Sequence, residues 1–149
     1  MTFKQNIKEV EELISKGWHY NAACLLSEIF LLDKENEKIA PLNFFSELNF
    51  SDINSNLTKD YEKIINITSY GKKWDEDELL LIFTYYIKIR LLADYFNHFS
   101  IDLNVDFLKL NSCIGDVNLK LHKAEIDYVK KMINKNWKGI NFETYWKLN

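Results

Sequence analysis

Apolar residues recur at helical spacing through the first third of the chain. Within residues 3–16 they form one stripe, at Phe3, Ile7, Val10 and Ile14. Gly17 follows directly and is typical of a helix C-terminal cap. A second apolar run over residues 19–32 ends at the polar segment 33–36. These two ranges predict a helical hairpin.

The middle of the chain contains its one proline. Pro41 has no amide donor and restricts the residue before it, so we expect a break there. A short helix over 42–48 and a loop over 50–56 should follow. Residues 57–70 again carry apolar side chains at helical spacing. The strongest pattern covers 75–99 and is apolar on nearly all faces at 79–87, which predicts a central, buried helix.

The last third of the chain predicts two more helices and a short terminal helix or tail. The helices cover residues 106–113, which Gly115 terminates, and 116–136, and the terminal helix or tail covers 142–148. No stretch alternates strongly enough to predict a strand. We therefore expect an all-α fold, with residues 1–149 forming a single domain, an irregular bundle of six to eight helices.

Charge is distributed unevenly along the chain. The net charge of −3 comprises −2 over residues 1–40, −5 over 41–106 and +4 over 107–149. An acidic first two thirds disfavours direct nucleic-acid binding, which needs clustered Lys and Arg. It suits a basic protein partner, although a solvated surface without any partner explains it equally well.

The N-terminal segment and the cysteines indicate the compartment. Residues 1–16 carry charges every few positions and lack the apolar core of a signal peptide. The uncharged apolar run 79–87 is too short to span a bilayer. Cys24 and Cys113 lie in apolar surroundings and are expected to be buried thiols, with one disulfide as the alternative. We expect a cytoplasmic protein without membrane contact; the choice between monomer and homodimer stays open.

Few residues have the spacing of a catalytic or metal site. Four acids at 75–78 form the densest cluster, and at a helix start they complement the helix dipole better than they indicate a metal site. The three histidines are far apart, and His122 with Glu125 supplies two ligands at most. Phosphate-binding glycine motifs and the nucleophile-elbow pattern are absent. We therefore expect no metal, no cofactor and no enzymatic activity.

One pair of residues resembles a known nuclease motif. The segment Arg90-Leu-Leu-Ala-Asp-Tyr-Phe-Asn-His98 resembles the Arg/His motif of HEPN-domain ribonucleases, which are all-helical and of similar length. Four to six residues separate the pair in that family, and seven do here. The resemblance implies a ribonuclease that uses Arg90 and His98. An ion pair between Arg90 and Asp94, four positions apart, is the structural alternative.

The first hairpin also resembles a repeat motif. Residues 12–36 resemble the middle of a tetratricopeptide repeat, with Gly17 at the turn and Ala22 at a close-packing position. The pattern does not recur about 34 residues later, as an array would require. We therefore expect one hairpin of this type.

The chain as a whole resembles a class of inhibitors. The chain is small and acidic, and it has 18 Lys against one Arg, which is typical of an AT-rich gene. In these respects it resembles the immunity proteins that bacteria pair with secreted toxins, including those of contact-dependent growth inhibition systems. The resemblance implies a binding protein that occludes a cognate toxin, such as a basic nuclease. A helical adaptor or regulatory module, including a phage anti-defence protein, is the alternative.

Because that resemblance carries no motif, the partner contacts are predicted from charge and aromatic content. Trp18, Trp74, Trp137 and Trp146 lie near predicted helix ends, where they anchor a partner or close the ends of the core. We expect the binding surface among Glu47, Asp52, Asp60, Glu62, Trp74, Asp75, Glu76, Asp77 and Glu78.

Overall fold

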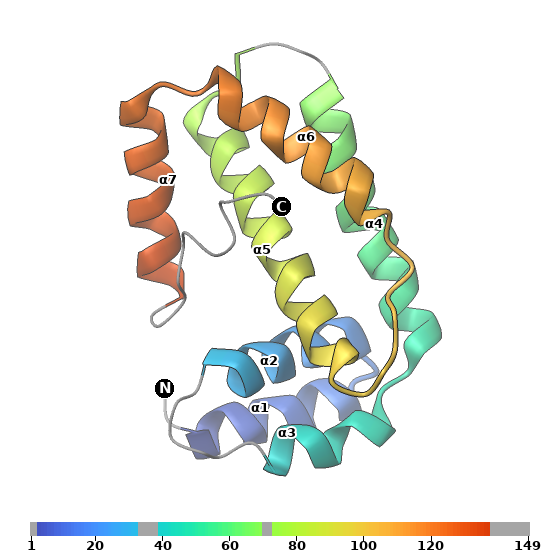
Figure 1. The fold of residues 1–149 in the computed structure, drawn as a ribbon. Helices are drawn as coiled ribbons and strands as arrows, with labels where there is room; N and C mark the ends of the chain where they lie inside the picture. Colours follow the sequence, from blue (N-terminus) through green and yellow to red (C-terminus); the bar gives the residue numbers. More distant parts are fainter. Residues whose placement is uncertain (1–2, 33–38, 70–72, 138–149) are drawn as a thin grey trace. The chain divides into compact units, whose positions relative to one another are not determined.

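The structure is a computed structural model that describes residues 3–32, 39–69 and 73–137. Within these ranges the fold is all-α and without strands, as predicted. Its elements are α1 (Phe3–Ser15), α2 (His19–Leu32), α3 (Ile39–Phe44), the 3-10 turn η1 (Phe45–Glu47), α4 (Phe50–Ser69), α5 (Glu76–Asn97), α6 (Phe107–Lys120) and α7 (Lys123–Asn136) (Figure 1). The terminal helix or tail predicted over 142–148 lies outside the described residues.

The chain divides into two compact units. Unit 1 comprises residues 1–58 and 90–104, and unit 2 comprises 59–89 and 105–149. The first part of α4 and the last part of α5 belong to unit 1, and the remainder of both helices belongs to unit 2. Each unit is described by itself, and the single domain over 1–149 stays a prediction.

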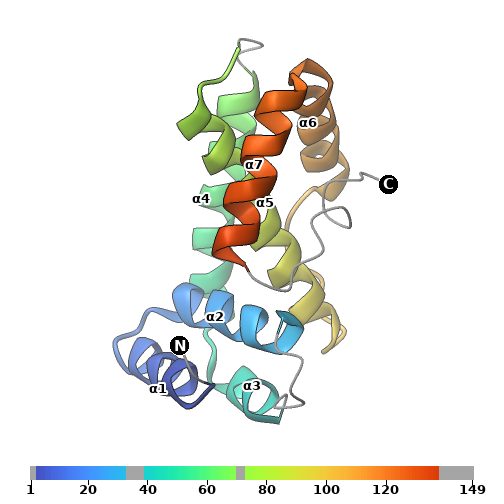
Figure 2. The same ribbon diagram turned by 90° about the vertical axis from the view of Figure 1, so that its left-hand side faces the viewer.

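Unit 1 begins with the predicted hairpin. Gly17 has a φ of 78°, a left-handed conformation that glycine adopts without a Cβ penalty. Its N–H donates to Ile14 over 3.0 Å and that of Trp18 donates to Leu13 over 2.9 Å, which is a Schellman cap. This cap turns the chain, and α1 packs alongside α2 (Figures 1 and 2). The likeness of this hairpin to a tetratricopeptide repeat stays a prediction.

Two predictions in the middle of the chain are wrong. Pro41 lies inside α3 rather than before a helix, because the first turn does not need the N–H that proline lacks. Residues 50–56 are helical rather than a loop. Asn49 caps α4, since its Oδ1 accepts the N–H of Asp52 over 3.2 Å, and Ile53 is fully buried.

Aromatic side chains form the core of unit 1 around the end of α5. Tyr95 and Phe96 are fully buried, and the hydroxyl of Tyr95 donates to the carbonyl of Pro41. Phe45 stacks on Phe99 with 3.5 Å between ring centroids, and Phe30 meets the Tyr95 ring edge-on at 5.4 Å. These contacts join α2, α3 and η1 to the last turns of α5.

Unit 2 contains most of α5, with α6 and α7. Leu79, Ile82 and Phe83 are buried, as expected for the central helix. Tyr86 is also buried, and its hydroxyl donates to Oδ1 of Asn111 on α6 over 2.9 Å. Across the described residues, none of the helices has the length and apolar character needed to cross a membrane.

The helix boundary predicted at Gly115 is wrong. α6 continues through Gly115 because Leu110, Ile114 and Val117 bury one face of it, which outweighs a glycine cost of about 1 kcal/mol. The break comes at Leu121 and His122 instead. His122 is the N-cap of α7, and its N–H donates to Oε1 of Glu125 in the first turn over 3.0 Å.

Candidate protein-binding surface

The four acids at the start of α5 divide into two roles. Asp75 and Glu78 cap the helix reciprocally: the N–H of Glu78 donates to Oδ1 of Asp75 over 2.8 Å, and the N–H of Asp75 donates to Oε1 of Glu78 over 3.1 Å. Glu76 and Asp77 lie between them in the first turn and are exposed. The capping pair begins the helix, while the middle two acids face solvent.

Asp60 on α4 lies beside two lysines of the same unit. The residue is 7% exposed, and its carboxylate oxygens lie 4.0 Å from Nζ of Lys63 and 3.9 Å from Nζ of Lys88. Both ammonium groups also lie over the Tyr85 ring, at 5.4 and 5.5 Å from its centroid. Asp60 is thus neutralised within unit 2, whereas its neighbour Glu62 is exposed.

Trp74 is a core residue of unit 2. Its side chain is only 6% exposed, and its indole N–H donates to the carbonyl of Ile67 over 2.9 Å. Nζ of Lys120 lies 5.6 Å from the ring centroid. Trp137 is half-buried, and Trp146 lies outside the described residues. Trp18 in unit 1 is instead 54% exposed, so among the described tryptophans it is the most accessible to a partner.

The remaining residues of the predicted surface belong to unit 1. Glu47 is exposed at the end of η1, and Asp52 is half-buried in the first turn of α4. These two acids therefore lie in a different unit from Glu62, Glu76 and Asp77.

The two units differ in charge. Formal charges give unit 1 a net −5 and unit 2 a net +2, although the sequence segments suggested an acidic middle. The difference arises because the acidic residues at 90–104 join the N-terminal part, while residues 59–89 join the lysine-rich C-terminal part. Unit 1 would therefore attract a basic protein more strongly than unit 2 would.

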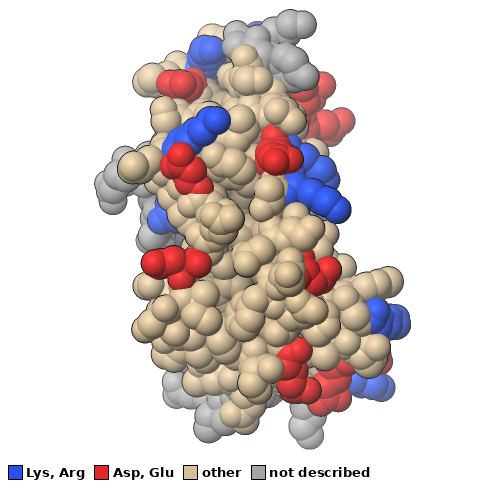
Figure 3. Space-filling model, turned by 90° about the vertical axis from the view of Figure 1, so that its right-hand side faces the viewer, with Lys and Arg blue, Asp and Glu red and all other residues tan. Residues whose placement is uncertain are grey.

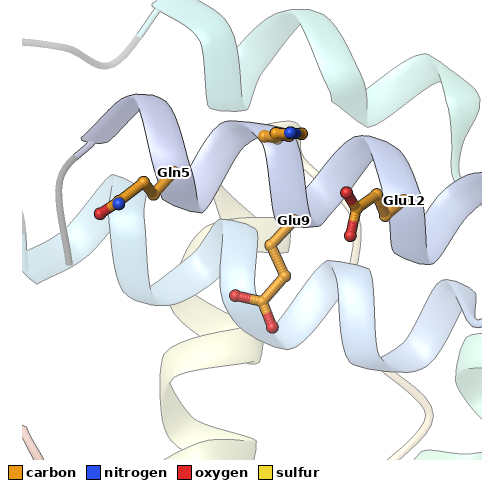
Figure 4. Close-up of a pocket in the computed structure, with 4 residues that line it drawn as sticks. Gln5, Glu9 and Glu12 are labelled. Atoms are coloured by element: carbon orange, nitrogen blue, oxygen red, sulfur yellow. The ribbon is translucent and has the colours of Figure 1, made fainter.

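A hollow on α1 presents acids that the sequence analysis did not select. It has a volume of about 460 Å³, and the described residues that line it are Gln5, Lys8, Glu9 and Glu12 (Figure 4). Their spacing of three or four residues places all four on one exposed stripe, whereas Val10 on the same helix is fully buried. The sequence feature that could have identified these residues is their helical spacing on the polar side of α1.

The side chains of this hollow do not converge. Figure 4 shows Gln5, Glu9 and Glu12 directed away from one another along α1. Among the residues that the structure describes, no three His, Cys, Asp or Glu side chains are grouped so that they could hold a metal ion. The arrangement suits an extended polar contact surface better than a site that concentrates charge on one atom.

The Arg90 and His98 pair lies in unit 1. Arg90 is half-buried within α5, and His98 is exposed one residue beyond the end of that helix. The His98 ring lies 5.0 Å from that of Phe30 and 5.3 Å from that of Phe99. Cys24 in unit 1 and Cys113 in unit 2 are not joined by a disulfide.

Charged side chains are dispersed over the face drawn in Figure 3. Acidic and basic residues alternate there, separated by broad uncharged areas. A partner that covers part of this face would meet charges of both signs. This distribution gives no reason to prefer that face for a basic partner over the stripe on α1.

Comparison with known proteins gives no match: no protein-family model, no curated protein and no solved structure is significantly similar to this chain.

Proposed function

We propose that this chain is a protein-binding inhibitor that neutralises a basic toxin domain by occlusion, as immunity proteins do, and that unit 1 provides the contact surface. The observation that supports it most is that Glu9 and Glu12 are exposed on one stripe of α1, beside Lys8, in a unit with a net charge of −5. Opposite charge steers association and raises the rate at which the two proteins meet.

The helix that carries this stripe is firmly held. Val10 is fully buried, and the Schellman cap at Gly17 terminates α1 at a defined position. Glu9, Glu11 and Glu12 are thus exposed on a packed helix rather than on a loop, which lowers the entropic cost of binding. Trp18, which directly follows the cap, adds an exposed aromatic side chain to the same unit.

The proposal narrows the surface expected from the sequence. Asp60 and Trp74 are buried, and Asp75 and Glu78 cap α5, so their loss would act through folding. Glu47 and Asp52 belong to the acidic unit and remain candidate contacts. Glu62, Glu76 and Asp77 are exposed in unit 2 and provide a matched comparison.

An affinity capture from lysate of the source cells, with tagged full-length chain, tests the proposal. It is performed at low and moderate salt, and the bound proteins are identified by mass spectrometry. One stoichiometric, basic, toxin-like protein whose binding weakens with salt supports neutralisation. Several unrelated partners, or an acidic one, would instead favour the adaptor interpretation.

A ribonuclease is the second candidate, because Arg90 and the exposed His98 lie in the same unit. Its test is cleavage of RNA by the purified protein and by Arg90→Ala and His98→Ala. Cleavage that both substitutions abolish, in proteins that retain their helical circular dichroism, would replace the inhibitor proposal. Cleavage that survives both substitutions eliminates this pair as the catalytic groups.

A further inference from the structure

Two large apolar side chains are almost fully exposed on α6. Leu108 and Leu119 are each 86% exposed, although leucine usually lies inside. They are eleven residues apart, close to three helical turns of 3.6 residues, so they lie on the same side of α6. The buried residues Leu110, Ile114 and Val117 occupy the opposite side.

The two residues that share one side of α6 with these leucines are small. At about 100° per residue, Ser112 and Gly115 fall on the same stripe as Leu108 and Leu119. Another helix can therefore approach closely at the centre of the stripe and meet a leucine at either end. We call these four residues, Leu108, Ser112, Gly115 and Leu119, the α6 stripe.

The α6 stripe is symmetric about its own midpoint. Leu108 and Leu119 are equally distant from the point between Cys113 and Ile114, and so are Ser112 and Gly115. If a second α6 lies antiparallel across this point, Leu108 of each copy meets Leu119 of the other. Ser112 of each copy likewise meets Gly115 of the other. This reciprocal pairing is what an interface with twofold symmetry requires.

Two opposite charges lie beside the stripe, and their midpoint is one residue from the stripe's own midpoint. Lys109 and Asp116 are seven residues apart, so they lie on one flank of the stripe. In an antiparallel pair related by a twofold axis, the flank of α6 that carries these two residues lies beside the same flank of the second copy. Lys109 of one copy then lies beside Asp116 of the other, offset by about 3 Å along the helix. Two opposite-charge pairs result, which favours this register.

We propose that the α6 stripe is the interface of a homodimer, in which α6 helices from two copies pack antiparallel. The occupant of the stripe is a second copy of this chain, because leucine contacts and charge pairs are both self-complementary. This surface belongs to unit 2, whereas the contact surface proposed for the toxin belongs to unit 1. The dimer and the inhibitor function therefore stand or fail separately.

Analytical ultracentrifugation of the full-length chain over a wide concentration range tests the dimer. Wild type should sediment as a monomer–dimer equilibrium. Leu119→Lys should raise the dissociation constant at least about tenfold, because the dimer loses the Leu108–Leu119 contact at each of its two ends. Trp18→Ser, an exposed apolar residue of unit 1, should leave the dissociation constant unchanged. Circular dichroism verifies that both variants are folded.

Charge exchange tests the register. Lys109→Asp and Asp116→Lys should each weaken self-association, because each places like charges opposite one another. An equimolar mixture of the two variants should form heterodimers, since both pairs then become opposite again. A monomer at every concentration, a dimer that Leu119→Lys leaves intact, or a mixture without preferential heterodimers would overturn the proposal.

Discussion

The indole N–H of Trp74 donates to the backbone carbonyl of Ile67 over 2.9 Å, seven residues earlier in the chain. This bond links the residues just before α5 to the last turns of α4. The Ile67 carbonyl lies near the C-terminus of its helix, where carbonyl groups lack helical partners, so the tryptophan satisfies an acceptor. This hydrogen bond explains why Trp74 is buried although its neighbours in the sequence, Lys73 and Asp75, are charged.

Trp74→Phe should destabilise the protein by about 1–3 kcal/mol, because it removes a buried donor as well as part of a packed ring. Urea unfolding followed by circular dichroism measures this change. Trp18→Phe is the matched control at an exposed site and should change the unfolding free energy by less than about 0.5 kcal/mol. Equal effects of the two substitutions would contradict a structural role for the Trp74 hydrogen bond.

Asp75→Ala should cost about 1 kcal/mol of unfolding free energy, because the N–H of Glu78 loses the side-chain oxygen that caps α5. Asp75→Ser should retain most of the stability, since a serine hydroxyl also caps a helix. Both are compared by urea unfolding. If serine were as destabilising as alanine, capping would not explain the acid at this position.

Stability should fall in alkaline solution because of Tyr95. Burial raises the pKa of this phenol above its ordinary value of 10.0. Above pH 10.0 the unfolded state loses the proton while the folded state keeps it, so the unfolding free energy declines by up to about 1.4 kcal/mol per pH unit. Below pH 10.0 both states are protonated and this contribution is constant.

Tyr95→Phe is the variant that isolates this effect. It should lower stability at neutral pH, because the carbonyl of Pro41 loses its donor, and should flatten the alkaline decline. The measurement is urea unfolding of both proteins at a series of pH values from about 8 to about 11, on either side of the ordinary phenol pKa. Parallel declines in the two proteins would show that other groups cause the pH dependence.

Charge reversal on α1 should slow binding of the captured partner. Glu9→Lys combined with Glu12→Lys should lower the association rate constant by about tenfold at low salt, with a smaller effect at high salt. Surface plasmon resonance measures both conditions. The control is Glu76→Lys combined with Asp77→Lys, an equal change of charge in unit 2.

If the unit 2 variant slows association as much as the α1 variant, total charge alone steers the encounter and the α1 stripe has no special role. If neither variant has an effect, the steering argument fails even when a partner has been found. Neither result bears on the proposed α6 dimer, because the dimer interface consists of other residues of unit 2.

The local features of the sequence predicted most of the helices. Residues 19–32 were delimited correctly, and the C-terminal cap at Gly17 is confirmed, because cap geometry and apolar periodicity depend on neighbours within one or two turns. The buried character of residues 79–87 within α5 was also predictable, since a helix that is apolar on all faces has to be covered.

The helix boundaries predicted wrongly are those that depend on contacts with residues distant in the sequence. Pro41 is helical in a segment that Tyr95 ties down from a position 54 residues away, and α6 passes Gly115 because its other face is buried. The same applies to the surface. The sequence determined that this chain is helical, acidic and rich in aromatic residues. Only the tertiary structure decided that Asp60 and Trp74 are covered while Glu9, Glu12, Leu108 and Leu119 are exposed, because exposure depends on which helices pack against each face.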